Sequence, residues 1–195
     1  MPPLWPDDSE RAWRHALARY PDVVAAQGVE RLAALDAWYQ QELPTTVGGR
    51  RPPHATHAEL VRLTEWKMAR GVWRAPNLVR VRNVPPQDVK DASTEALAAA
   101  PDPRRPIAIL SKLDGVGPAT ASALMAAARP ETYPFFDELV AAQVPTLGKV
   151  AWTLGYYLKY AAALRERAAA LGGGWTPAMV ERALWAHAGG KAGGR

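Results

Sequence analysis

Apolar residues recur at helical spacing through most of this chain, and proline or glycine separates the segments that carry them. Trp13, Ala16 and Leu17 share one face of a predicted helix, because residues three and four positions apart lie side by side on a helix. Leu164 and Leu171 repeat the pattern near the C-terminal end. There is no convincing pair of alternating, strand-like segments. The sequence therefore predicts an all-α fold.

Proline, glycine and capping residues set the predicted ends of the helices. Gly71 and Gly172 end two of them, and Thr176 caps the last. Residues 45–53, with Gly-Gly and Pro-Pro pairs, are predicted to form a loop, and the prolines of residues 72–85 predict an irregular segment. Helices are predicted at residues 10–20, 29–42, 57–70, 86–96, 104–113, 118–127, 152–171 and 177–188.

The chain has 195 residues and no cysteine. This length suits one compact unit, and the missing thiols exclude disulfides, cysteine nucleophiles, thiolate zinc sites and iron–sulfur clusters. The four histidines show no spacing typical of a metal site. The N-terminal residues do not resemble a signal peptide, and no apolar run approaches the roughly 20 residues that span a bilayer. We expect a cytoplasmic protein, nucleoid-associated if bacterial, with no membrane partner.

Positive charge is concentrated in one part of the chain. The net charge is +5, and residues 46–82 alone hold eight lysines and arginines against two glutamates. Such a concentration is typical of a surface that binds a polyanion. A well-solvated basic face is the alternative, and the composition does not decide between the two.

A pair of glycines flanks Val116 between two predicted helices, and Pro118 begins the second of them. Because Gly115 and Gly117 carry no side chain, a phosphate can approach the backbone of this turn. Amides at the start of the second helix can bind an anion, which the positive end of the helix dipole also attracts. An ordinary packing hairpin with a glycine-rich bend is the alternative. The residues predicted to contact DNA here are Lys112, Gly115, Val116, Gly117, Ala119 and Thr120.

The pattern Leu-x-Gly-Val-Gly-x-x-Thr-Ala, at residues 113–121, resembles the helix-hairpin-helix of the base-excision DNA glycosylase superfamily, which includes the endonuclease III-like enzymes. In that family an essential aspartate lies at the start of the next helix. Asp137 stands 20 positions after Gly117, as we expect in endonuclease III-like members. The resemblance implies that Asp137 is catalytic and stabilises the positive charge of the sugar as the base leaves. A helix cap is the alternative role for this aspartate.

The resemblance also implies an architecture and a partner. Two helical lobes would flank a cleft, the middle one at residues 57–128 with the hairpin at 110–127, and the other at residues 1–56 plus 129–195. The expected partner is double-stranded DNA containing a lesion, bound by a monomer. A non-catalytic helix-hairpin-helix DNA-binding protein is the alternative function, and a helical scaffold without a nucleic-acid role is a third.

Three departures from the family pattern refine the expected chemistry. Ala119 occupies the position of the lysine with which bifunctional members form a Schiff base, so we expect hydrolysis by water and no hairpin-lysine lyase activity. The loop before Asp137 contains Pro130 and Pro134 but no glycine, and Glu138 follows where relatives often have threonine. No cofactor is expected to be required, although the resemblance implies that a structural Na+ or K+ would bind the backbone carbonyls of Ser111, Leu113 and Val116.

A second basic motif interleaves aromatic and basic residues before Gly71. Lys67, Arg70 and Arg74 recur at about one helical turn and are predicted to meet DNA phosphates from one face. Trp66 and Trp73 are candidates for stacking on an extruded base, with packing in the core as the alternative. Lys67 is also the best placed amine for any lyase activity.

Overall fold

The computed structural model describes residues 2–191, and within this range it contains helices and no strand. The all-α prediction is therefore confirmed. The elements in chain order are α1 (Glu10–Ala18), α2 (Tyr20–Ala25), α3 (Leu32–Ala37), the π-helical turn η1 (Trp38–Glu42), α4 (Leu43–Gly49), α5 (His57–Arg70), α6 (Ala75–Arg82), α7 (Pro86–Ala98), α8 (Arg105–Leu110), α9 (Pro118–Ala128), α10 (Glu138–Ala141), the 3₁₀ turn η2 (Pro145–Leu147), α11 (Leu154–Leu171) and α12 (Pro177–His187).

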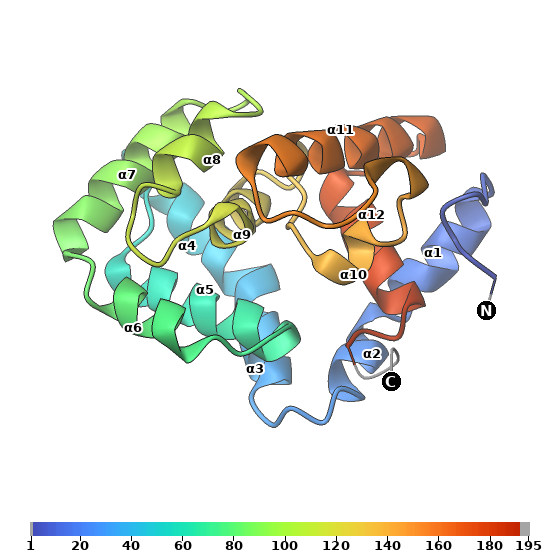
Figure 1. The fold of residues 1–195 in the computed structure, drawn as a ribbon, viewed down its shortest axis with the longest axis horizontal. Coiled ribbons are helices and arrows are strands. Elements are labelled where there is room, and N and C mark those ends of the chain that lie inside the picture. Colours follow the sequence, from blue (N-terminus) through green and yellow to red (C-terminus); the bar gives the residue numbers. More distant parts are fainter. Residues whose placement is uncertain (1, 192–195) are drawn as a thin grey trace.

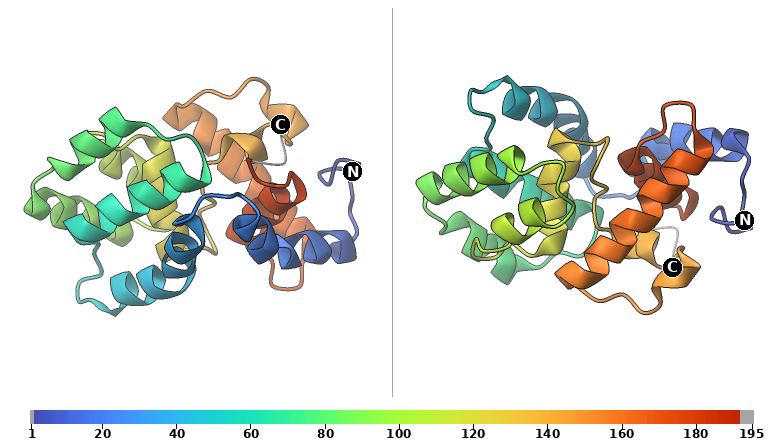
Figure 2. Two further views of the ribbon diagram at one scale, coloured as in Figure 1. Left: turned by 90° about the horizontal axis from the view of Figure 1, so that it is seen from below. Right: turned by 90° about the horizontal axis from the view of Figure 1, so that it is seen from above.

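Helix α9 lies near the middle of the molecule, with α4, α5 and α8 packed against it (Figure 1). Its residues from Ala119 to Ala127 are all buried, because small side chains let several helices approach it closely. A second group forms where α1 and α11 pack on α12. Both further views show these helices to the right of α9 (Figure 2). Within residues 2–191, no helix is both long and apolar enough to cross a bilayer.

The N-terminal helices are divided between these two groups. Helices α1 and α2 contact α12, whereas α3 packs on α5 and α4 packs on α9. Residues 32–49 thus lie with helices that the sequence places in the middle lobe. The predicted division at residues 56 and 128 stays a prediction.

Two helices form where the sequence predicts irregular structure. Helix α4 includes Pro44 and continues to Gly49, so the predicted helix end before Pro44 and the first part of the predicted loop at 45–53 are wrong, while residues 50–53 lie outside the helices. Helix α6 likewise has Pro76 in its first turn, inside the segment predicted to be irregular. A proline in the first turn of a helix loses no hydrogen bond, because its amide would have no partner there. Pro76 therefore begins a helix. Pro44 instead lies within a continuous helical run at residues 32–49, directly after the π-helical turn η1, which accommodates it.

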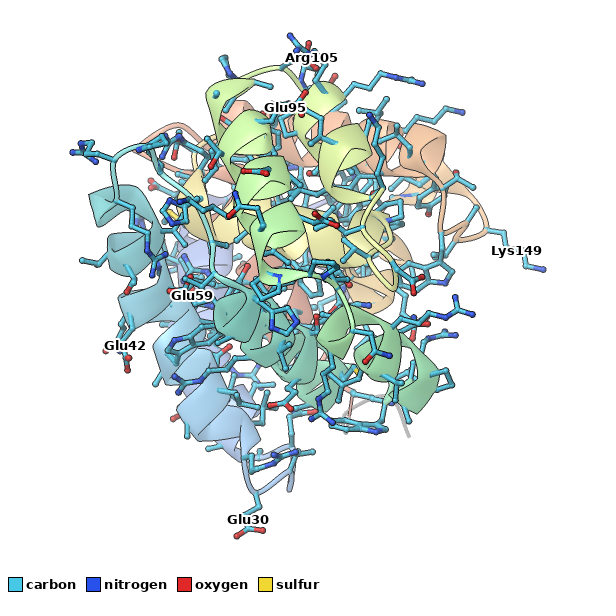
Figure 3. All side chains as sticks on the ribbon, turned by 90° about the vertical axis from the view of Figure 1, so that its left-hand side faces the viewer. Glu30, Glu42, Glu59, Glu95, Arg105 and Lys149 are labelled. Atoms are coloured by element: carbon cyan, nitrogen blue, oxygen red, sulfur yellow. The ribbon has the colours of Figure 1, made fainter. Side chains whose placement is uncertain are left out.

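Helix α5 carries much of the candidate site and has the predicted bounds. Thr56 and Glu59 form a capping box, in which each side chain bonds the backbone amide of the other residue, at 2.7 and 3.3 Å. Trp66 stacks on Tyr39 with ring centroids 3.6 Å apart, and both rings are buried. Trp66 therefore belongs to the core and is not a base-stacking residue. Charged side chains such as those of Glu30, Arg105 and Lys149 project outward from the surface (Figure 3).

Candidate active site

A cavity of about 250 Å³ brings together residues that are distant in the sequence. The end of α5, the segment after it, the start of α9 and the residues around Asp137 all contribute. Its lining consists of Lys67, Arg70, Gly71, Val72, Arg74, Asn77, Gly117, Pro118, Ala119, Thr120, Phe135, Phe136, Asp137, Glu138, Leu139, Trp152 and Lys191. Several residues from the two predicted DNA-binding motifs therefore share one cavity with the predicted catalytic aspartate.

Asp137 is a helix cap and a wall of this cavity at the same time. Its Oδ1 atom accepts a hydrogen bond of 2.8 Å from the amide of Leu139 in α10, and the residue is 7% exposed. Its Oδ2 atom lies 3.9 Å from Nε of Arg70. The two roles considered from the sequence are therefore compatible, because the cap holds one carboxylate oxygen and leaves the other toward the arginine.

The loop before Asp137 is held by buried hydroxyl groups. The amide of Phe136 donates to Oγ of Ser122 in α9 at 3.0 Å. The hydroxyl of Tyr160 in α11 donates to the carbonyl of Phe135 at 2.7 Å, and that of Tyr157 donates to Pro134 at 3.3 Å. Each bond satisfies a backbone group that burial would otherwise leave unpaired. The loop is thereby tied to α9 and α11 on both sides.

Arg70 is buried and does not face a DNA backbone. It is 1% exposed, and its guanidinium pairs with Glu181 of α12 while its Nε has no hydrogen-bond partner. It also lies 4.5 Å from the ring centroid of Trp185. The prediction that Arg70 meets phosphates alongside Lys67 and Arg74 is wrong, because the helix turns this side chain into the core.

Glu181 is a buried neighbour of the cavity residue Arg70, and the sequence did not predict it. Burial raises the pKa of its carboxyl group, although Arg70 opposes this shift. The available signal was a glutamate among the apolar positions of the last helix, on the same face as Leu184 and Trp185. A carboxylate on an apolar face needs a buried partner, and Arg70 is that partner.

Lys67 lies one turn before Arg70 and is half-buried in the cavity wall. Burial lowers the pKa of its ammonium group to about 8; the charge of Arg74 acts in the same direction, and Asp137 opposes both. Arg74 itself is exposed at the rim. These two cations thus differ from the buried Arg70, since Lys67 is partly exposed and Arg74 is exposed.

The two hairpin glycines have different tasks. Gly115 has φ +76°, and a Cβ atom there would lie 2.6 Å from the carbonyl oxygen of Asn77 and 2.8 Å from Cβ of Arg80. Gly115 therefore packs against α6 and leaves no room for a phosphate on that side. Gly117 is exposed, and a Cβ atom there would meet nothing within 4 Å. The predicted open turn thus applies at Gly117.

The first amides of α9 point to anion binding at the cavity. Gly117 caps this helix, and the amides of Ala119 and Thr120 belong to its first turn, where no helix carbonyl is within reach. Their side chains are 5% and 2% exposed, so any contact with DNA uses the backbone. Val116 is buried and its amide bonds the Leu113 carbonyl at 3.1 Å. Lys112 is exposed on the loop and lies outside the cavity lining.

Oxygen atoms near the hairpin fit the monovalent cation that the resemblance implies. Oγ of Ser111 is buried and has no hydrogen-bond partner among residues 2–191. The Leu113 carbonyl accepts one amide and keeps a second lone pair. A neutral oxygen donor set suits a weakly held monovalent ion, and in the same range there is no cluster of three histidine or acidic residues for another metal.

Ion pairs reduce the positive charge of the basic stretch. Arg50 pairs with Glu59 and Arg82 with Glu65, each at 2.8 Å, and Arg70 is buried with Glu181. Part of residues 46–82 is therefore neutralised within the protein. The exposed cations that remain include Arg51, Arg62, Arg74 and Arg80.

Exposed aromatic side chains lie close to the cavity. Trp152 is 44% exposed and packs on Phe136, with ring centroids 4.9 Å apart. Trp73 is 49% exposed, beside Val72 and Arg74 of the lining.

Comparisons of the chain with protein-family models, with curated proteins and with solved structures found no match. The functional assignment therefore depends on the chemistry of this cavity.

Proposed function

We propose that this protein is a DNA glycosylase that hydrolyses the N-glycosidic bond of a damaged or mismatched base in double-stranded DNA. The observation that carries the proposal is the shared cavity of about 250 Å³, in which the Asp137 carboxylate lies with the first amides of α9. The two-lobed helix-hairpin-helix architecture is part of the same proposal. Helical composition alone would fit many other functions.

The amides of Ala119 and Thr120 bind a DNA phosphate beside the cavity, and the dipole of α9 adds to the attraction. The adjoining nucleotide rotates out of the duplex into the cavity, where its base can stack on exposed aromatic rings. Trp152 offers such a ring, and the buried Phe136 packs behind it. These contacts position the nucleotide without reading the sequence around it.

Asp137 acts on the bond between sugar and base. As this bond breaks, positive charge develops on the sugar, and a nearly buried carboxylate stabilises it more strongly than a solvated one. Arg70 and the Leu139 amide hold the carboxylate in place, at 3.9 and 2.8 Å. Because Ala119 provides no amine, water attacks the sugar, and base release leaves an abasic site. If a monovalent cation binds near Ser111, it supplies positive charge beside the phosphate.

Base release from defined duplexes tests the proposal. Duplexes that carry alkylated, deaminated or oxidised bases are incubated with the protein, and hot alkali then breaks the strand at each abasic site. Wild type is expected to release at least one of these bases. Asp137→Asn should abolish release while the fold is kept, because asparagine also caps helices. Asp102→Asn is the matched control, since Asp102 likewise accepts backbone amides but lies outside the cavity lining.

A non-catalytic DNA-binding protein is the second candidate, because the α9 amides bind DNA whether or not Asp137 reacts. Both functions predict binding that weakens with salt, so binding alone does not separate them. Full activity of Asp137→Asn, or no product from the whole panel, would refute the glycosylase proposal. Gly117→Glu then separates DNA binding from a scaffold role, since the structure leaves room for this side chain and its charge opposes a phosphate.

A further inference from the structure

Lys67 stands out among the lysines because it comes from α5 and yet lies in the same cavity as Asp137. Lys191 also lines the cavity, but it is exposed and its Nζ donates to the Gly71 carbonyl at 2.7 Å. Lys112 is exposed outside the lining. Lys67 is thus the partly buried amine of the cavity.

The setting of Lys67 favours a reactive amine. Burial lowers the pKa of its ammonium group to about 8, with a further contribution from Arg74. At pH 7 roughly one such amine in ten is unprotonated, against fewer than about one in a thousand at an ordinary lysine pKa. Among the ion pairs of residues 2–191, none joins Lys67 to Asp137, so the amine is not held as a salt bridge.

The part of α5 that carries Lys67 is anchored by packing. Its neighbours Trp66 and Met68 are buried, and α5 packs on α9. The helix that carries Lys67 is therefore anchored on α9, and Lys67 lines the cavity together with Ala119 and Thr120 of the first turn of α9. A helix that is anchored on both sides of a residue orients that residue without a loop rearrangement.

We propose that Lys67 is a nucleophile that attacks the abasic sugar left in the cavity after base release, which gives the protein a strand-cleaving lyase activity independent of a hairpin lysine. The inference rests on the proposed function, because the abasic sugar is its product. In its open form that sugar is an aldehyde at C1′. A neutral lysine amine adds to an aldehyde to form a Schiff base.

The step balances without an added reagent. Nζ of Lys67 bonds to C1′, the carbonyl oxygen leaves as water with the two amine protons, and a proton from solvent gives the protonated imine. Asp137 accepts a proton from C2′, the electron pair forms a C2′=C3′ double bond, and the C3′–O bond breaks. The 3′ phosphate leaves with the downstream strand. Water then hydrolyses the imine and returns Lys67 as the free amine, and the protons on the imine and on Asp137 return to solvent.

Reductive trapping on DNA that already contains an abasic site tests this inference. The full chain is incubated with an abasic duplex and sodium borohydride, which converts the imine into a stable covalent adduct. Wild type is expected to form the adduct, and peptide mapping should find the mass increase at Lys67. Lys67→Ala should reduce the adduct to background. Lys67→Arg keeps the positive charge and should bind the duplex but form no adduct.

Lys159→Ala is the matched control, because Lys159 is exposed on α11 and lies outside the cavity lining. Trapping by wild type should rise as the pH passes through about 8. No adduct in wild type, or an adduct that survives Lys67→Ala, overturns the inference. Because the abasic duplex bypasses base release, the two proposals fail separately. Base release without trapping would refute the lyase proposal alone. Trapping without base release would refute the glycosylase proposal.

Discussion

Replacing Gly115 by alanine should destabilise the protein far more than the same change at Gly117. Both glycines lie in the turn between α8 and α9, so a motif comparison treats them alike. In the structure Gly115 has positive φ and faces the backbone of α6, whereas Gly117 has extended backbone and open space around it. The pair therefore separates the packing role of the turn from its role in binding an anion.

The expected loss at Gly115 has two sources. Left-handed backbone costs a residue with a Cβ atom roughly 1–2 kcal/mol. The new methyl group would lie 2.6 Å from the Asn77 oxygen and 2.8 Å from Cβ of Arg80, and relieving such crowding costs about 1–3 kcal/mol. The free energy of unfolding should thus fall by about 2–5 kcal/mol. Gly117→Ala should change it by less than about 1 kcal/mol.

Thermal and denaturant unfolding measure the difference. For a chain of this size, Gly115→Ala should lower Tm by roughly 5–20 °C, and Gly117→Ala should leave it nearly unchanged. DNA affinity of the folded variants is measured below their Tm. Equal stability of the two variants would refute the packing argument, because it would mean that α6 does not restrict Gly115.

Three further predictions concern the surroundings of the cavity. Glu181→Ala removes the closer of the two carboxylates that pair with the buried Arg70, the other being Asp137, and should cost about 3–5 kcal/mol by urea unfolding, whereas Arg70→Met with Glu181→Leu should recover most of the loss; equal stability of the single and double variants would contradict this. The lowered pKa of Lys67 means that the folded state binds fewer protons than the unfolded state between about pH 8 and 10.5. Wild type should therefore gain stability relative to Lys67→Met over that range, with Lys67→Met more stable at pH 7, and a pH-independent difference in Tm would argue against a buried amine. Tyr160→Phe leaves the Phe135 carbonyl without its buried donor and should cost about 1–3 kcal/mol. It should also lower kcat for base release more than it raises KM, and normal kcat would show that the loop does not depend on this bond.

Local sequence signals determined the helical character and several helix ends. Thr56 with Glu59 starts α5, Thr176 with Pro177 starts α12, and Pro118 starts α9. These predictions succeed because a cap acts on amides two or three residues away, so its effect is contained in a short segment. Asp137 as a cap belongs to the same class.

Local signals failed where a proline can either end a helix or belong to one. Pro76 lies in the first turn of α6, and Pro44 lies inside the continuous helical run of residues 32–49, although both were expected to interrupt the chain. The sequence does not show whether a proline begins, ends or lies within a helix, because its fixed φ angle is compatible with each position. Packing of α4 on α9 and of α6 on α5 decides it.

The chemistry of the cavity was decided by tertiary structure. Spacing along α5 places Lys67 and Arg70 one turn apart, which predicts a common surface, yet the structure buries Arg70 against Glu181 and leaves Lys67 at the cavity. Glu181 lies 111 positions from Arg70, so no local pattern contains the pair. The sequence by itself thus determined the helical character, most of the helices and the candidate carboxylate, but not α4 or α6. Which charges are buried, paired or left reactive depends on contacts between distant segments, because desolvation and charge pairing arise only when those segments meet.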